Sequence, residues 1–196
     1  MHVGARAPRV PYARSVASAR DRVLDAYETL LISVGPTAAT LDAVAAAAGV
    51  SKGGLLYHFA SKDALAAGLL GRLRERSAAD ADAVREAPGG AAAYHLRTSA
   101  PGGGIDGGLT RTYLAALRVG DHARDGTAVR DALAAVDADA LAALRDRLGD
   151  PVLAWLVQLV GDGLYLRTLI GTPLPEGLGV DDLLRCLGPQ LAPPEP

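Results

Sequence analysis

The 196-residue sequence predicts an all-α protein of about nine helices. Apolar residues recur at spacings of three and four along most of the chain, which is the helical period. β-branched and aromatic residues rarely alternate with polar ones over four or more positions, so strand signals are almost absent. A hydrophobic fraction of 49% is enough for a core. The length suits one large domain, or a small domain joined to a larger one.

The first helix is predicted over residues 15–34, where one apolar stripe ends at Gly35-Pro36. A short helix follows Thr40, a suitable N-cap, and ends at Gly49, because glycine adopts a left-handed turn with little strain. Two helices joined by a tight glycine turn are typical of a helix-turn-helix, although similar corners also occur in proteins that do not bind DNA.

A third helix is predicted over residues 52–59 with Ser51 as its N-cap, and a fourth from Ser61 to about Arg85. The third is too short to be stable alone and must be held by packing. The natural anchors against the first and fourth helices are Val44, Val50, Leu55 and Phe59. Adjacent glycines at 53 and 54 cost about 2 kcal/mol together in a helix, so we expect a compensating role for them.

Five further helices are predicted at 91–99, 107–121, 127–148, 151–171 and 180–190. The sequence SAPGGGIDGG separates the first two of these and indicates a flexible loop. Residues 191–196 are expected to be a disordered tail.

Composition excludes several classes of protein. The most apolar stretch, 152–170, contains Gln158, Asp162 and Arg167, which argues against a membrane span. The N-terminus lacks the apolar region of a secretory signal, so a cytoplasmic location is expected. Cys186 is the only cysteine and the four histidines are scattered, so neither a metal site nor a cofactor is expected.

The net charge of −2 is unevenly distributed along the chain. Residues 1–74 carry nine Lys/Arg and five Asp/Glu, a net of +4, whereas residues 75–196 carry eleven and seventeen, a net of −6. This polarity fits a protein whose N-terminal end meets a polyanion. Random surface composition would explain it equally well.

The N-terminal segment closely resembles the signature of TetR-family transcriptional repressors over about residues 16–75. The matching residues are Thr40, Val44-Ala45, Ala48-Gly49-Val50-Ser51-Lys52-Gly53, Tyr57-His58-Phe59, Ser61-Lys62 and Leu65. Leu56 departs from the pattern, because the family usually has tyrosine there. The resemblance implies an N-terminal arm and helix-turn-helix DNA-binding domain over 1–62 and a ligand-binding and dimerisation domain over 63–190.

The residues that the resemblance assigns to DNA binding are Thr40, Ser51, Lys52, Gly53, Gly54, Tyr57, His58 and Lys62. Glycines at 53 and 54 would let the start of the helix approach DNA closely. Lys52 could reach a guanine edge or a phosphate, and Lys62 a phosphate. Packing is the alternative role for Tyr57, and a half-buried place beside Phe59 is the alternative for His58.

Three arginines, Arg6, Arg9 and Arg14, precede the first helix. They could form an arm along a DNA groove or backbone. A solubilising tail is the alternative.

The resemblance also implies a homodimer in which the last two helices pair with those of a second copy. The expected interface residues are Leu153, Leu156, Val157, Val160, Leu164, Leu183, Leu184 and Leu187. The helix 151–171 is apolar nearly all round, which suits burial by its own body on one side and by a partner on the other. A central core helix is the alternative.

A small-molecule pocket is implied within the helices from about 91 to 171. Its candidate lining residues are Tyr94, His95, Tyr113, Leu117, Arg118, Trp155, Gln158, Leu159 and Tyr165. Their surroundings, mostly Leu, Ala and Val, favour a mainly apolar ligand.

The predicted function is therefore a homodimeric DNA-binding transcriptional regulator, a repressor released from its operator by a small, mainly apolar ligand. The alternative is a helical ligand-binding or protein-interaction module without operator-specific DNA binding. An enzyme is not expected, because GGGIDGG lacks the ending of a phosphate-binding loop and no nucleophile with a base is evident. Asp162 and Arg167 are more simply explained by a buried ion pair or an interface contact.

Overall fold

The computed structural model describes residues 18–101, 108–120 and 126–191, with side chains as far as residue 188. Within these residues it contains helices and no strands, as the sequence predicts. The nine helices are α1 (Ala19–Ser33), α2 (Leu41–Ala48), α3 (Lys52–His58), α4 (Lys62–Glu86), α5 (Ala91–Ser99), α6 (Gly108–Gly120), α7 (Thr127–Leu148), α8 (Pro151–Ile170) and α9 (Val180–Leu191).

The predicted helix boundaries differ from the observed ones mainly at the chain ends. Helix α1 begins at Ala19 and not at Ser15, because the Ser18 hydroxyl caps it by accepting from the Asp21 amide at 3.1 Å. Helix α9 includes Leu191, which the sequence assigns to the tail. Arginines 6, 9 and 14, the rest of the predicted tail and most of the glycine-rich loop lie outside the described residues.

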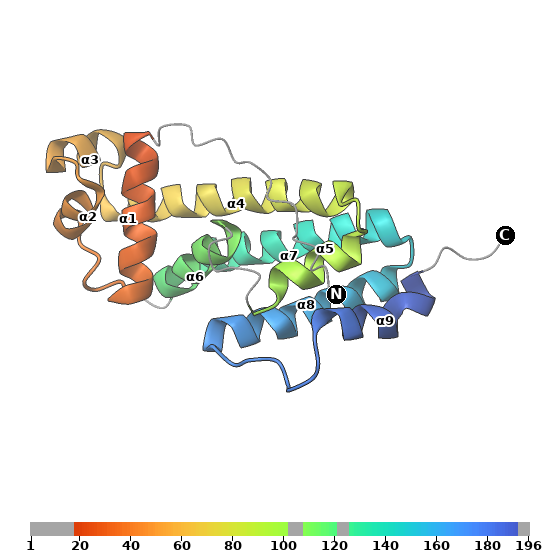
Figure 1. Ribbon diagram of the computed structural model, residues 1–196. Coiled ribbons are helices and arrows are strands. Elements are labelled where there is room, and N and C mark those ends of the chain that lie inside the picture. The colour runs from red at the N-terminus through yellow and green to blue at the C-terminus, as the bar shows by residue number, and fades with distance from the viewer. Residues whose placement is uncertain (1–17, 102–107, 121–125, 192–196) are drawn as a thin grey trace.

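The helices form a head and a body (Figure 1). Helices α1 to α3 lie together at one end, and the long α4 runs from that end along one side of the body. Helices α8 and α9 lie along the opposite side, with α5, α6 and α7 between. The division predicted between residues 62 and 63 stays a prediction; α4 begins there and packs on both parts.

Local capping interactions fix where the head helices begin and where α2 ends. The Thr40 hydroxyl accepts from the Ala43 amide at 3.2 Å, and the Ser51 hydroxyl accepts from the Gly54 amide at 3.0 Å. Gly49 ends α2 in the left-handed conformation, with φ at 64°. Because these bonds are local, the sequence alone is enough to place the turn between α2 and α3.

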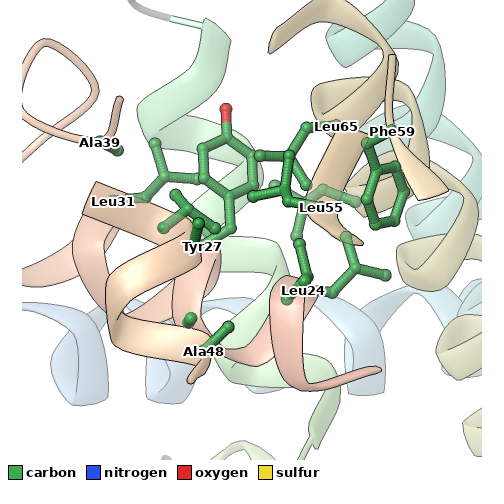
Figure 2. Close-up of a cluster of buried hydrophobic side chains, with 14 residues drawn as sticks. Leu24, Tyr27, Leu31, Ala39, Ala48, Leu55, Phe59 and Leu65 are labelled. Carbon is green, nitrogen blue, oxygen red and sulfur yellow. The ribbon is translucent and has the colours of Figure 1, made fainter. Parts of the chain in front are cut away.

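A buried cluster holds the three head helices together (Figure 2). Tyr27 lies among Leu24, Leu31 and Leu55, and its burial raises its pKa to about 12. Helix α4 contributes Leu65 to the same cluster. The predicted anchors are confirmed: Val44, Leu55 and Phe59 are buried, and Val50 packs against them. The short α3 is therefore held in place by the head core.

Gly68 of α4 allows the ring of Phe59 to pack closely. A Cβ at position 68 would lie 2.5 Å from Phe59 Cε1, which is too close for two carbon atoms. Phe59 in turn carries the guanidinium of Arg20 over its ring, 5.5 Å from the centroid.

A charge cluster around the buried residues Glu28, Arg72 and Thr112 joins the head to the body. With the half-buried Arg76 and Arg111, we call it the joint cluster. The Glu28 side chain is 1% exposed and accepts from Arg72 Nη1 at 3.3 Å and from Arg76 Nη1 at 3.2 Å. It also accepts from the Thr112 hydroxyl at 2.8 Å, and Arg111 Nε lies 3.4 Å from it. The cluster thus ties α1 to both α4 and α6.

By length and mean hydropathy, 1.2, α8 is the one described helix that could cross a membrane. Its Leu153, Ala154, Val157 and Leu164 are buried in the body core, where α5 and α7 also contribute. The core helix of a globular protein passes the same test of length and composition, so this finding is weak evidence of a membrane span.

Candidate nucleic-acid interface and ligand-binding body

The predicted DNA-binding residues come together on the outer surface of the head. They lie at the start of α2, along α3 and at the start of α4. All are exposed except Gly54, which is half-buried. The buried side of α3, formed by Leu55 together with Phe59 at its C-terminal end, keeps this surface facing outward.

Three hydroxyl groups at helix N-termini can still donate a hydrogen bond. In Thr40, Ser51 and Ser61 the oxygen accepts from a backbone amide, at 3.2, 3.0 and 3.0 Å. Each hydroxyl hydrogen remains available to an external acceptor. Helix N-termini attract anions through their free amides and the helix dipole, so this surface suits phosphate groups.

Both lysines of the chain already have partners within the protein. Lys52 Nζ lies 2.9 Å from Oδ1 and 3.0 Å from Oδ2 of Asp42 on α2. Lys62 Nζ donates to the carbonyl oxygen of Pro36 at 2.7 Å, which fastens α4 to the turn after α1. An ammonium group has three donors, so each lysine could keep its partner and bind another acceptor.

The two adjacent glycines have different surroundings. A Cβ on Gly53 would meet nothing within 4 Å, whereas one on Gly54 would lie 3.2 Å from the Ser51 hydroxyl. Packing within the chain therefore does not require glycine at position 53.

Tyr57 is the projecting aromatic residue of α3. It is 86% exposed, whereas Leu56, at the position where the resembled family usually has tyrosine, is 38% exposed. His58 is also exposed, which corrects the alternative of a half-buried histidine. Its ring meets that of Tyr57 edge-to-face at 5.2 Å between centroids. Because Phe59 takes the core position, Tyr57 and His58 point outward.

The body interior contains two buried polar groups that lack a full set of partners. His95 on α5 and Gln158 on α8 are 9% and 7% exposed, and neither His95 Nε2 nor Gln158 Oε1 has a hydrogen-bond partner among the described residues. Burial lowers the pKa of His95 to about 4, so the imidazole is neutral at pH 7. Gln158 Nε2 donates to the backbone oxygen of Asp137 on α7 at 3.1 Å.

Two tyrosines of the predicted pocket contact each other across α6 and α8. Tyr113 of α6 and Tyr165 of α8 meet edge-to-face at 5.5 Å, and the Tyr165 hydroxyl donates to the carbonyl of Thr110 at 3.2 Å. Tyr94 is half-buried and donates to Asp80 Oδ1 at 3.2 Å. Leu117 is half-buried on α6.

Three predicted pocket residues do not face the body interior. Arg118 is exposed on α6, and Trp155 and Leu159 are 56% and 48% exposed on α8. Residues four apart on a helix share one face, so Trp155 and Leu159 project together, away from the core side that carries Leu153 and Val157. The pocket prediction is wrong for these three residues.

The interface prediction for α8 also needs correction. Leu153, Val157 and Leu164 are buried in the core of their own chain, and Val160 packs partly against it. Leu156 is the one predicted α8 residue that is clearly exposed, at 45%. The exposed apolar residues of α8 form a continuous line that we call the outer stripe: Val152, Trp155, Leu156, Leu159, Leu166 and Ile170.

The predicted residues of α9 are only partly available to a partner. Leu183, Leu184 and Leu187 are half-buried and pack against the body core. Asp162 is exposed, and Arg167 donates to the backbone oxygen of Pro173 at 3.1 Å. A buried ion pair between Asp162 and Arg167 is therefore wrong.

The described residues contain no group of three His, Cys, Asp or Glu side chains placed to hold a metal ion. Cys186, on α9, is exposed as a free thiol.

A helix-turn-helix head on a larger helical body is the architecture of a DNA-binding transcriptional regulator. Residues 23–69, which run from α1 through the head into the first turns of α4, match the family described as "Bacterial regulatory proteins, tetR family". The resemblance seen in the sequence is thus confirmed.

Similar proteins extend the comparison to the whole fold. The HTH-type transcriptional regulator AlkX of Mycobacterium tuberculosis is 45% identical over 69 residues, which are 35% of this chain and a third, 33%, of that relative's length. A TetR-family member from Streptomyces coelicolor A3 is 25% identical, with a TM-score of 0.63 over 90% of this chain and 99% of that one. The multidrug binding protein EbrR, complexed with imidazole, is 28% identical, with a TM-score of 0.58 over 91% and 97%.

Several residues of interest escape sequence reasoning. Asp42 and Glu28 gain their partners only through the fold, and no sequence signal points to them. The outer stripe could have been found, because Val152, Leu159, Leu166 and Ile170 recur at spacings of seven, seven and four.

Proposed function

We propose that the protein is a homodimeric, DNA-binding transcriptional regulator that acts as a cytoplasmic repressor and is released from its operator by a small molecule. The observation that carries this proposal is the outer surface of α3. This seven-residue helix is fixed by a buried core and presents Lys52, Gly53 and Tyr57 outward.

In this proposal α3 enters the major groove of operator DNA. Lys52 reaches a base edge or phosphate from the first turn, and the Tyr57 hydroxyl binds a phosphate in place of the tyrosine that the family usually has one position earlier. The N-termini of α2 and α4 supply hydroxyl and amide donors from Thr40 and Ser61 to the backbone. A good base contact contributes about 1–3 kcal/mol of discrimination.

DNA binding is tested by fluorescence anisotropy with duplexes from the gene's own upstream region. We expect binding that weakens steeply between about 50 and 200 mM salt. Lys52→Ala should reduce the preference for the specific duplex, whereas Lys62→Ala should weaken specific and scrambled duplexes alike. Absence of binding to any intergenic DNA near the gene would overturn the proposal and favour the alternative, a helical ligand-binding module.

The outer stripe supports the homodimer. It exposes six large apolar side chains on one face of a 20-residue helix, about 30 Å in length. A contiguous apolar face of this kind marks an interaction surface, and two copies of α8 with α9 can cover each other's stripes. The half-buried leucines of α9 would complete the edge of the interface.

Sedimentation velocity tests the dimer. The wild-type protein should sediment as a dimer, and Leu159→Arg with Leu166→Arg should give a folded monomer. Ala78→Arg, on the exposed side of α4, is the matched control and should leave the dimer intact. A wild-type monomer at micromolar concentration would contradict the dimer proposal.

The body interior supports the effector. The unpartnered atoms His95 Nε2 and Gln158 Oε1, together with the Tyr113 and Tyr165 rings, suit a mainly apolar or aromatic ligand that carries a hydrogen-bonding group. EbrR, a multidrug binding protein of similar fold, has been crystallised with ethidium at 27% identity to this chain.

Calorimetry with DNA-free protein tests this site, with ethidium as the first probe. We expect binding that weakens about tenfold in Gln158→Leu and stays unchanged in Trp155→Leu, which alters the outside of α8. Equal effects of the two substitutions would place the ligand elsewhere.

A further inference from the structure

We infer that Asp42 is a specificity-determining residue: it holds Lys52 and so limits the binding of this lysine to phosphates of arbitrary sequence. The inference rests on the proposed DNA-binding function and names a residue that the predicted interface did not include.

The geometry shows a paired lysine at the start of the recognition helix. Lys52 Nζ contacts both carboxylate oxygens of Asp42, at 2.9 and 3.0 Å. The two residues are ten positions apart and meet only because the turn at Gly49 sets α3 against α2. Their side chains are 58% and 69% exposed, so the pair lies on the open surface of the head.

The pair also contains every Asp, Glu, Lys and Arg side chain of the helix-turn-helix unit, residues 41–58. Between residues 41 and 58, Asp42 is the only acidic residue and Lys52 the only Lys or Arg. The one positive side chain of this unit is thus bonded to its one negative side chain. Lys62, just beyond the unit, donates to the Pro36 carbonyl.

This arrangement separates two kinds of contact. On DNA of arbitrary sequence, the new contact open to Lys52 is a phosphate. To bind it, the ammonium group must exchange the Asp42 carboxylate for the phosphate, and the freed carboxylate stays close to the DNA backbone. Because an exposed ion pair is weak, Lys52 can leave Asp42. The net gain in binding free energy is small, because one ion pair replaces another. On a specific site the ammonium can keep Asp42 as one acceptor and give another hydrogen to a guanine edge.

The experiment compares two duplexes: one selected from a random pool with the wild-type protein, and a scrambled duplex of equal length and composition. Asp42→Asn should tighten binding to the scrambled duplex several-fold at low salt. The slope of log K against log salt should steepen by about 0.9, because one more phosphate is neutralised. Binding to the selected duplex should change less. The ratio of the affinity for the selected duplex to the affinity for the scrambled duplex should therefore fall several-fold.

Three variants show whether Asp42 acts through Lys52. Asp42→Glu should keep the wild-type slope, because it preserves the ion pair. In a Lys52→Ala background, Asp42→Asn should leave the slope unchanged. Asp131→Asn makes the same change of charge at an exposed position of α7 and should leave the binding of both duplexes unchanged.

Several results would overturn the inference. It fails if the salt slope of Asp42→Asn equals that of the control Asp131→Asn. It also fails if Asp42→Asn steepens the salt slope in the Lys52→Ala background. A wild-type protein that binds no duplex would instead refute the proposed function, which keeps the two failures distinct. The salt slope is informative because a loss of folding would weaken binding to both duplexes without steepening it.

Discussion

The joint between head and body differs from the interior of the body in how buried polar groups are satisfied. In the joint, Glu28 is fully buried and accepts from two arginines and a threonine. In the body, His95 and Gln158 each have a buried atom without a partner among the described residues. Buried polar groups in folded proteins are nearly always hydrogen-bonded. The joint thus satisfies its own buried charge, whereas the body interior leaves two buried polar atoms without a partner among the described residues.

The largest expected effect tests the joint. Glu28→Ala should destabilise the protein by about 3–5 kcal/mol, because it removes the buried acceptor that Arg72, Arg76 and Thr112 share. Arg72 keeps its ion pairs with Asp21 and Asp25. Urea unfolding measures this change. Glu75→Ala, on the exposed side of α4, should stay within about 0.5 kcal/mol. A small loss in Glu28→Ala would show that the joint is not a closed cluster.

The second effect tests the neutral histidine of the body. Burial lowers the pKa of His95 from 6.5 to about 4, so between these values the unfolded chain binds a proton that the native chain does not. Stability should therefore fall as the pH decreases through this window, by about 3 kcal/mol in total for this group. Unfolding of wild type and His95→Leu between pH 7 and 4 measures it. Identical pH dependence in the two proteins would contradict the burial of His95.

The third effect tests how tightly His95 is packed. A Cβ on Gly161 of α8 would lie 2.4 Å from His95 Nε2, so Gly161→Ala should cost about 1–3 kcal/mol. Gly71→Ala is the matched control in α4: its Cβ meets nothing within 4 Å, and it should gain about 0.5–1 kcal/mol. In a His95→Ala background the cost at Gly161 should largely disappear. Equal costs with and without His95 would mean that another group fills the space.

The smallest effect extends the comparison to the head. Gly53→Ala should stabilise the protein by about 0.5–1 kcal/mol, because the new Cβ meets nothing within the chain. The same substitution should weaken DNA binding if the absent side chain serves close approach to DNA. Thermal unfolding and anisotropy measured on one sample separate the two effects. Unchanged affinity would remove the proposed role of Gly53.

The local parts of the fold could be predicted because local interactions decide them. Thr40, Ser51 and Gly49 mark helix ends through bonds to residues a few positions away. The faces of α8 could not be assigned in the same way. Leu153 and Leu156 have the same chemistry, and only the packing of α5 and α7 decides which is buried.

The candidate sites show the same limit. The predicted recognition surface consists of residues close together in the sequence, so the sequence alone can group them. The Asp42 to Lys52 pair and the joint cluster bring together residues 10 to 84 positions apart, and periodicity contains no information on such contacts. Composition alone makes every aromatic residue of the body a pocket candidate, and so includes Trp155, which lies on the surface.

The position of Trp155 has a practical consequence. It is the only tryptophan of the chain and lies on the outer stripe, 56% exposed. Its emission therefore reports on the solvent around that one face of α8, since no second indole contributes. The protein thus has an intrinsic optical probe at the surface where a second copy is proposed to bind, and dilution series can be followed without a label.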